Sequence, residues 1–274
     1  DLHQAEKALA QLACLVVQDL FMHETAEKAH VFLPAAAFAE KDGTFTNSER
    51  RVQRIRRALP PPGQTRPDWW VTGELARRIA RRLGLPPTGF DYDDPSQIWT
   101  ELVSLWPAVA GISYARLESG GLQWPCPTPE HPGTRFLYAE SFPRGRARFV
   151  PVEQTATAAE LPDPDYPLIL STGRVLYHWH GGTLTRRLQG LLELAPRLEI
   201  AVNPADARRL GIETGARVRM TSRRGELDGY AQVTEAVRAR VVFVPFVKLE
   251  TSAANFLTNS AHDPSAKIPE YKVC

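Results

Sequence analysis

The 274-residue sequence is short of cysteine, of long apolar runs and of net charge, and each shortage excludes a class of protein. Its three cysteines, Cys14, Cys126 and Cys274, stand far apart, so none forms the close spacing of a self-contained zinc or iron–sulfur site, and a disulfide framework is not expected. No apolar run approaches the length of about 18 residues that a membrane-spanning helix needs. The formal net charge of +2 gives no overall attraction to nucleic acid or to an anionic membrane.

Two local features qualify this picture. Residues 1–12 already have helical character and no signal peptide precedes them, so we expect the chain to begin inside a domain, with sequence missing before it.

Five arginines lie within eight residues, which is typical of a solvated face. A nucleic-acid function would rest on these arginines alone, without the interleaved aromatic residues that bind single strands. They are Arg50, Arg51, Arg54, Arg56 and Arg57.

The first hundred residues favour a parallel α/β unit. Residues 15–19 and 30–38 are short apolar runs of the buried-strand type, and residues 23–29 between them are compatible with a turn of helix. In such sheets ligands bind beyond the carboxyl ends of the strands, where Gln18 and Asp19 lie. The alternative is that Asp19 caps the next turn.

The stretch PDWWVTGELARRIARRLG, residues 67–84, predicts an amphipathic helix. Asp68 is a natural N-cap, because its carboxylate can accept from the N–H groups of the first turn. Gly84 ends the helix, and Pro86 follows it. Apolar residues recur at helical spacing with arginines on the other side: Val71, Leu75, Ile79 and Leu83 against Arg77, Arg78, Arg81 and Arg82.

The composition changes twice after this helix. Residues 84–165 are rich in proline and glycine, so we interpret 107–165 as an irregular crossover that wraps a surface rather than forming a core. After Tyr166, short strand-like runs appear, with a hairpin turn on Gly225 and a short helix capped by Asn203. Many short strands favour a closed β barrel, which has no exposed edge. The runs are 168–171, 198–202, 217–222, 227–234 and 241–246.

The most polar motif follows the first of these strands. Thr172, Gly173 and Arg174 would suit a phosphate-bearing ligand, because glycine lets the backbone approach closely and arginine offers a bidentate fork. His178 and His180 have no nearby carboxylate or cysteine to complete a metal shell, although distant ligands could join them. The remaining alternative is a polar loop whose buried histidines are paired with backbone groups.

The C-terminal stretch is also polar. Asn255 can donate and accept at once, which suits the edge of a purine or a pterin, and its alternative role is that of a turn residue. Lys272, near the end of the chain, would by itself be a solvated lysine.

Four long stretches resemble one known family. They are LVVQDLFMHETAEKAHVFLPAAAF with its continuation to Trp70, GGLQWPCPTPEHPGT, YPLILSTGRVLYHWHGGTLTRR and NFLTNSAHDPSAKIPEYKVC. In this order, over essentially all 274 residues, they resemble the large (alpha) subunit of molybdopterin-dependent formate dehydrogenases, of the prokaryotic molybdopterin oxidoreductase (DMSO reductase) superfamily. TNSERRVQRIRRALPPPG and LQWPCP favour formate dehydrogenase over the sister nitrate reductases.

The resemblance implies an α/β plus β barrel fold. A partial Rossmann-like α/β body would cover residues 1–106, and an irregular crossover would cover 107–165. Residues 166–274 would form a double-psi β barrel that binds a molybdopterin dinucleotide.

The resemblance also assigns cofactor contacts, but no catalytic residue and no metal ligand. Gln18 and Asp19 match positions that contact a guanosine, and Lys41 and Asp68 match further contacts. Phe246, Asn255 and Lys272 match closing contacts, and we expect Lys272 and Arg174 to face one cleft between the barrel and the α/β body. The cofactor loop matches Thr172, Gly173, Arg174, Val175, Leu176, Tyr177, His178, Trp179, His180 and Gly181, and its histidines are not expected to bind metal.

The family's cofactors are two molybdopterin guanine dinucleotides that hold molybdenum or tungsten. Its metal-ligating cysteine or selenocysteine, its catalytic arginine and its iron–sulfur cysteines lie upstream of the matched region, and Cys14, Cys126 and Cys274 do not match them. The implied partners are the rest of the catalytic subunit and iron–sulfur or flavin electron-transfer subunits, without nucleic acid or direct membrane insertion. We expect a cytoplasmic location, with the periplasm left open because the N-terminus is missing.

Three functions remain open at this point. The first is the C-terminal cofactor-binding part of a formate dehydrogenase, which oxidises formate to carbon dioxide by two electrons. The second is part of a related enzyme such as nitrate reductase, and the third is a cofactor-binding module without turnover. The genomic sequence before Asp1 would separate them, through a cysteine or selenocysteine followed by histidine.

The missing metal ligand gives a direct prediction. The 274-residue chain alone, loaded with metal and cofactor, should not reduce an artificial dye with formate. Spectrophotometric dye-reduction assays check this, and robust turnover by the isolated chain would contradict it.

Overall fold

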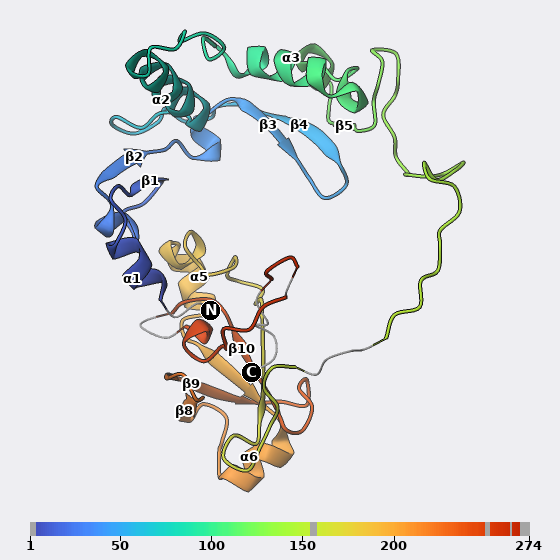
Figure 1. The fold of residues 1–274 in the computed structure, drawn as a ribbon. Helices are drawn as coiled ribbons and strands as arrows, with labels where there is room; N and C mark the ends of the chain where they lie inside the picture. Colours follow the sequence, from blue (N-terminus) through green and yellow to red (C-terminus); the bar gives the residue numbers. More distant parts are fainter. Residues whose placement is uncertain (1–3, 154–157, 250–252, 264, 269–274) are drawn as a thin grey trace. The chain divides into compact units, whose positions relative to one another are not determined.

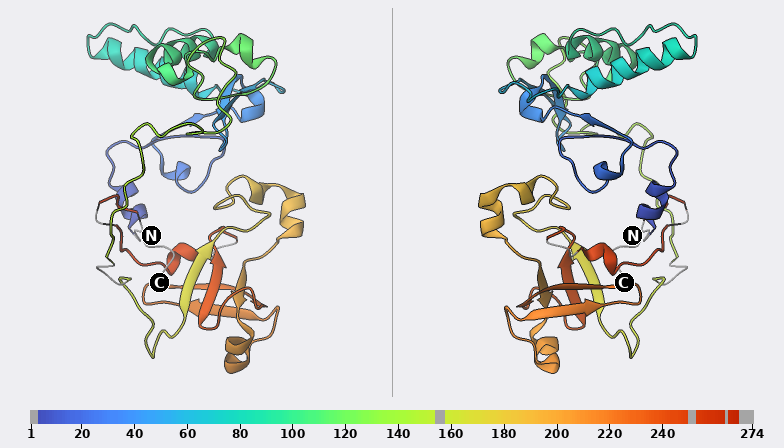
Figure 2. Two further views of the ribbon diagram at one scale, coloured as in Figure 1. Left: turned by 90° about the vertical axis from the view of Figure 1, so that its right-hand side faces the viewer. Right: turned by 90° about the vertical axis from the view of Figure 1, so that its left-hand side faces the viewer.

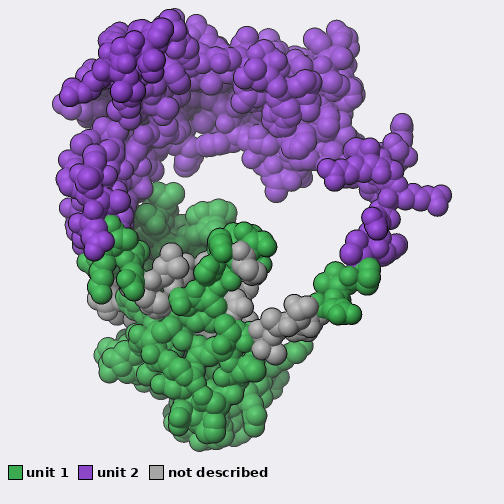
Figure 3. All heavy atoms as spheres, viewed as in Figure 1, with its two compact units in different colours: residues 1–8, 151–274 green, residues 9–150 purple. Residues whose placement is uncertain are grey.

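The computed structural model describes residues 4–153, 158–249, 253–263 and 265–268. The chain divides into two compact units, shown in different colours in Figure 3. Unit 1 comprises Asp1–Ala8 and Pro151–Cys274, and unit 2 comprises Leu9–Val150. Helix α1 (Ala5–Ala10) lies at the junction between them along the chain.

Unit 2 begins with the predicted parallel pair of strands. Strand β1 (Val16–Asp19) pairs with β2 (Val31–Pro34), and the short 3-10 turn η1 (Ala26–Lys28) lies between them in sequence. The register places Gln18 opposite Leu33 and Asp19 opposite Pro34. The carboxyl ends of both strands therefore meet at one edge, as the strand–turn–strand pattern predicts.

A second, antiparallel sheet and several helices complete unit 2 (Figure 1). Strands β3 (Gly43–Thr46), β4 (Arg51–Ile55) and β5 (Leu122–Gln123) pair in that order. The helical elements are η2 (Phe38–Glu40), α2 (Asp68–Arg82), α3 (Pro95–Leu105), η3 (Pro107–Val109) and α4 (Tyr114–Leu117).

The expectation that residues 107–165 only wrap a surface is wrong for the first part of this segment. Val109, Ile112, Leu117 and Cys126 are almost completely buried and form a core with Val52 and Trp99. Trp99 Nε1 donates to the carbonyl oxygen of Ile112 at 2.8 Å, so the core also satisfies its buried polar group. Proline and glycine excluded long elements here, but they did not exclude burial.

Helix α2 spans the predicted residues, but its N-terminus differs from the prediction. Its N-cap is Pro67 and no side chain caps it, so the assignment of Asp68 as the N-cap is wrong. Asp68 is the first helical residue, and its carboxylate accepts hydrogen bonds from Gln18 and Lys41 instead. Within the described part of unit 2, Leu75, Ile79 and Leu83 on the apolar stripe remain 46–67% exposed.

Unit 1 contains a five-stranded mixed sheet with the strand order β6-β10-β7-β9-β8. The strands are β6 (Ile169–Gly173), β7 (Glu199–Val202), β8 (Arg217–Thr221), β9 (Glu226–Val233) and β10 (Val241–Pro245). β6 and β10, which lie side by side in Figure 2, are parallel, as are β7 and β9. β6 and β8 lie at the two ends of the order, so the expected closed barrel is not seen among the described strands.

The local predictions for unit 1 hold. Helix α6 (Pro204–Leu210) has Asn203 as its N-cap, and Gly211 ends it in a left-handed conformation with φ of 67°. Strands β8 and β9 form the hairpin. The other helical elements are η4 (Thr185–Arg187), α5 (Gln189–Leu194) and η5 (Ala254–Phe256). Residues from β6, β7, β9 and β10 build the core, including Leu170, Ile200, Leu227 and Val244.

No helix in the described ranges combines the length and the apolar character that crossing a membrane requires.

The core of unit 2 leaves no space for a side chain at Gly111. A Cβ atom there would lie 1.9 Å from the carbonyl oxygen of Thr128, so the backbone would have to move. We expect Gly111→Ala to lower the free energy of unfolding by about 1–3 kcal/mol or more. Gly190→Ala is the control, because its Cβ meets open space in α5 and the change should raise stability by up to about 1 kcal/mol. Urea unfolding measures both variants, and equal stabilities would contradict the prediction.

Candidate functional site

The predicted cofactor loop of unit 1, residues 172–181, begins at the end of β6. The parallel pairing of β6 with β10 places Gly173 opposite Pro245, and Phe246 N donates to Gly173 O at 3.1 Å. Arg174 and Phe246, the residues that follow the two strands, are thereby neighbours, with the guanidinium carbon 5.9 Å from the ring centroid. The His180 ring lies 6.0 Å from Phe246 and 4.8 Å from Trp179, so three aromatic rings follow one another beside Arg174.

His178 is a structural residue of this loop. Its side chain is buried, and its Nε2 lies 2.9 Å from the carbonyl oxygen of Ala195, which can only accept. Nε2 therefore carries the proton, and Nδ1 accepts from the Thr185 hydroxyl at 3.2 Å. Thr185 Oγ1 in turn accepts from Trp179 N at 3.1 Å. Both ring nitrogens are used, so His178 fits the alternative of a buried histidine paired within the protein.

The chain reverses just after His180. His180 has φ of 49° and Gly182 has φ of 79°, and a Cβ at Gly182 would lie 2.8 Å from Val247. Gly181 O accepts from Lys248 N at 3.2 Å, and Gly182 N donates to Trp179 O at 2.9 Å. These bonds hold the loop beside the segment after β10, and Trp179 and His180 in this loop are exposed.

The remaining loop residues divide into buried and exposed ones. Thr172 is buried, and Val175 packs against the core, whereas Arg174, Leu176 and Tyr177 are exposed. In the described residues, no carboxylate pairs with Arg174. A free guanidinium beside exposed aromatic rings is a donor set that suits an anionic ligand with a flat ring system.

The two C-terminal candidates are not joined to this loop by any described contact. Asn255 lies exposed in η5, and its carbonyl oxygen accepts from Thr258 Oγ1 at 3.3 Å. Lys272 lies outside the described residues, as does the expectation that it shares a cleft with Arg174.

Unit 2 brings together three of its four candidates. Asp68 accepts from Gln18 Nε2 at 2.7 Å through Oδ1 and from Lys41 Nζ through Oδ2. Asp19 stands beside this cluster in sequence, but its carboxylate accepts from Leu20 N at 2.6 Å and contacts His23 Nε2 at 3.2 Å. Asp68 thus links the carboxyl end of β1 to the segment that carries Lys41.

The Asp68 carboxylate is held in its charged form. Its partial burial raises its pKa, but the hydrogen bonds from Lys41 and Gln18 and the charge of Lys41 outweigh burial and leave the pKa below its ordinary value of 3.8. Each carboxylate oxygen has more than one lone pair, and the side chain is 48% exposed, so Asp68 can still accept from a ligand.

A pocket of about 320 Å³ adjoins Lys41 and Asp68, and most of its wall was not predicted from the sequence. Phe45, Trp69 and Tyr114 give it aromatic sides. Trp69 directly follows Asp68, so the WW pair could have drawn attention to it. Tyr114 is far away in sequence and gave no signal.

Across the ranges that the structure describes, no three histidine, cysteine, aspartate or glutamate side chains converge in an arrangement that could hold a metal ion.

The Asp68 cluster predicts a dependence of stability on pH. Because the pKa of Asp68 is lowered on folding, its charged contacts stabilise the fold fully above the ordinary value of 3.8 and lose this effect as the pH falls through the lower folded value. Asp68→Asn should therefore be less stable than the wild type near pH 7, and the difference should shrink below pH 3.8. Urea unfolding at several pH values checks this, and a difference independent of pH would exclude the charged cluster.

Comparison with known proteins finds a molybdopterin-related family model in each unit. Residues 1–78 match the family model "Molybdopterin oxidoreductase", and residues 168–274 match "Molydopterin dinucleotide binding domain". The structure also resembles acetylene hydratase from Pelobacter acetylenicus, with a TM-score of 0.70 over 99% of this chain and 41% of that chain. Because the two chains are only 18% identical, this likeness shows the fold alone.

Curated relatives extend the match over the whole chain. The "F420-dependent formate dehydrogenase 2 subunit alpha" of Methanococcus maripaludis is 48% identical over 276 residues, and the F420-dependent formate dehydrogenase subunit alpha of Methanocaldococcus jannaschii is 47% identical. Each match covers all of this chain and 40% of the relative. A nitrate reductase of Symbiobacterium thermophilum is 37% identical over 98% of this chain and 38% of its own length. The chain therefore spans about 40% of the length of the F420-dependent relatives, and it contains a molybdopterin oxidoreductase segment in residues 1–78 and a molybdopterin dinucleotide-binding domain in residues 168–274.

Proposed function

We propose that this chain is part of a formate dehydrogenase catalytic subunit and supplies much of the pocket for its molybdopterin guanine dinucleotides. The observation that carries the proposal is the identity of 41–48% to formate dehydrogenase alpha subunits over the full length of this chain. Nitrate reductases match at 35–37%. The difference favours formate over nitrate as the substrate of the whole protein.

The charges and rings of unit 1 fit the dinucleotide. The Arg174 guanidinium is exposed and can form two hydrogen bonds to phosphate oxygens, while Trp179, His180 and Phe246 offer faces to a pterin or a base. In this proposal the His178 ring does not contact the cofactor. It holds the loop in shape through Thr185 and Ala195.

The Asp68 cluster of unit 2 fits the edge of a base. A carboxylate accepts from neighbouring N–H groups of guanine, and Gln18 and Lys41 fix the carboxylate in place. The pocket with Phe45, Trp69 and Tyr114 adds aromatic surface beside it. Asp19, Asn255 and Lys272 complete the proposed contact set by family resemblance.

The bound dinucleotides with molybdenum or tungsten would supply the two-electron chemistry that converts formate to carbon dioxide. The residues of this chain would bind and orient the dinucleotides and would not take part in bond breaking. Under this proposal, residues 166–274 form a double-psi barrel in the complete subunit, and residues 1–106 belong to its α/β body. An iron–sulfur region of the same subunit would accept the electrons first, and iron–sulfur or flavin subunits would then carry them away. We propose that the complete enzyme acts in the cytoplasm.

Arg174 provides the test. In the full-length subunit, Arg174→Lys keeps the charge but loses the fork, so dinucleotide affinity should fall about ten- to a hundredfold, or roughly 1.5–3 kcal/mol. Arg208→Lys, an exposed change on α6, is the matched control. Cofactor content after gel filtration measures the retention of the dinucleotide.

Two assays of the wild-type full-length subunit then separate the alternatives. Formate-dependent dye reduction supports the proposal, whereas oxidation of a reduced dye by nitrate would point to nitrate reductase. A bound cofactor without either activity would point to a non-catalytic module. Unchanged cofactor content in Arg174→Lys would contradict the proposal that the loop carrying Arg174 binds the dinucleotide.

A further inference from the structure

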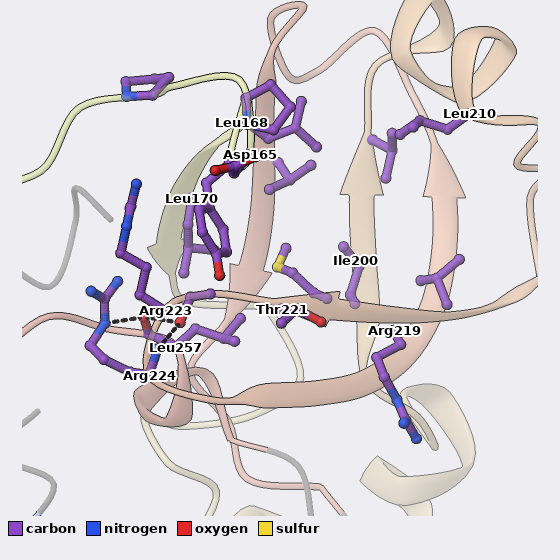
Figure 4. Close-up of a pocket in the computed structure, with 18 of the residues that line it drawn as sticks. Asp165, Leu168, Leu170, Ile200, Leu210, Arg219, Thr221, Arg223, Arg224 and Leu257 are labelled. Carbon is purple, nitrogen blue, oxygen red and sulfur yellow. Dashed lines mark hydrogen bonds between the residues drawn. The ribbon is translucent and has the colours of Figure 1, made fainter.

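The turn between β8 and β9, residues 222–225, is bonded to the segment that carries Asn255. Ser222 Oγ and Arg224 Nε both donate to the carbonyl oxygen of Leu257, at 2.9 and 3.0 Å, and Figure 4 draws these bonds beside the labelled Leu257. A Cβ at Gly225 would lie 2.8 Å from the carbonyl oxygen of Phe256, so the turn touches η5 directly. Two donors on one carbonyl fix the chain two residues after Asn255.

The same turn also holds the segment that leads into β6, residues 160–167, which we call the strap. Glu160 accepts from Arg223 and, at 2.7 Å, from Arg224 Nη1, and Asp163 accepts from Arg223. The Arg223 guanidinium lies 4.4 Å from the centroid of the Tyr166 ring. Glu160 and Arg224 are only 16% and 20% exposed, so water weakens this ion pair less than it weakens a surface pair.

Packing alone holds the strap loosely. Beside it lies an open pocket of about 210 Å³, lined mainly by apolar side chains of the sheet such as Leu170 and Ile200, with Arg223 and Arg224 among its lining residues (Figure 4). Strap residues that face this pocket have fewer packed protein neighbours than residues of the core. The directional bonds of Arg223 and Arg224 therefore contribute to the position of the strap. The bond of Arg224 to the Leu257 carbonyl adds to the core packing of the Leu257 side chain.

We propose that Arg224 is a positioning residue for dinucleotide binding. The inference rests on the proposed function, because both segments that Arg224 joins lead to predicted cofactor contacts. The strap continues into β6, which ends at Gly173 directly before Arg174, and Leu257 lies two residues after Asn255. Through its Nε and Nη1 atoms, Arg224 ties these two segments together, although it does not belong to the cofactor loop.

The geometry requires arginine rather than any cation. One planar guanidinium places Nε on Leu257 O and Nη1 on Glu160 Oε2 at the same time. A lysine has a single nitrogen and can keep the charge interaction with Glu160 only by giving up the fixed geometry at Leu257. Arg224→Lys should therefore behave like Arg224→Gln at the Leu257 segment.

The experiment uses the full-length, cofactor-loaded subunit. Arg224→Gln, Arg224→Lys and Glu160→Gln are compared with Arg208→Gln, an equal loss of charge at an exposed position on α6. Hydrogen–deuterium exchange of residues 253–263 measures the fixing of the segment, and the rate of cofactor loss on dilution measures retention. We expect both rates to rise about tenfold in the two Arg224 variants, less in Glu160→Gln, and not in the control.

Asn255→Ala separates this inference from the proposed function. It should speed cofactor loss while leaving the exchange of residues 253–263 unchanged, because it removes a contact without cutting the bonds to Leu257. If the rate of cofactor loss is unchanged in Asn255→Ala while the Arg224 variants raise exchange, the proposed cofactor contact at Asn255 is wrong. The link that Arg224 forms between Leu257 and Glu160 is then still supported. If exchange does not rise in either Arg224 variant, Arg224 does not fix the Leu257 segment, and the inference is wrong. Raised exchange with unchanged cofactor loss in both overturns the positioning role.

Discussion

The parallel pairing of β6 with β10 is the constraint on which the candidate site of unit 1 depends. The two strands are about 70 residues apart in sequence, yet their register brings Gly173 and Pro245 to the same edge of the sheet. The residues that follow the two strands, Arg174 and Phe246, are therefore neighbours. An antiparallel pairing would have sent these two ends to opposite edges of the sheet. The bonds of Gly173 and Gly181 to the segment after β10 extend this constraint along the loop.

Much of this could be predicted from the sequence, because the signals are local. The strands of both sheets that carry candidates, the hairpin on Gly225 and the capped helix after Asn203 follow from short apolar runs and from turn residues. Asp68 shows where local rules stop. Its position before a helix made it a natural cap, but Gln18 and Lys41, 50 and 27 residues away, offered its carboxylate stronger partners. Sequence spacing contains no information about such distant donors.

The same limit explains the other errors. Val109, Ile112 and Cys126 lie in a stretch with no regular period, so their burial against Val52 and Trp99 could not be inferred from periodicity. The expectation of a closed barrel goes beyond what the described strands show, because their order leaves β6 and β8 at its ends. Of the two histidines in the loop, only the structure separates buried His178 from exposed His180, since both have similar sequence surroundings.

The candidate sites of the two units differ in charge, although each lies at the carboxyl end of a strand in a parallel pair. In unit 2, Lys41 compensates the Asp68 carboxylate, so this pair attracts no phosphate and suits the uncharged, polar edge of a base. In unit 1, Arg174 stands beside aromatic rings with no carboxylate partner in the described residues, so it keeps its charge for an anion. Within unit 2 the Asp68 cluster would therefore contribute selectivity for the edge of a base, and within unit 1 Arg174 would contribute affinity for a phosphate.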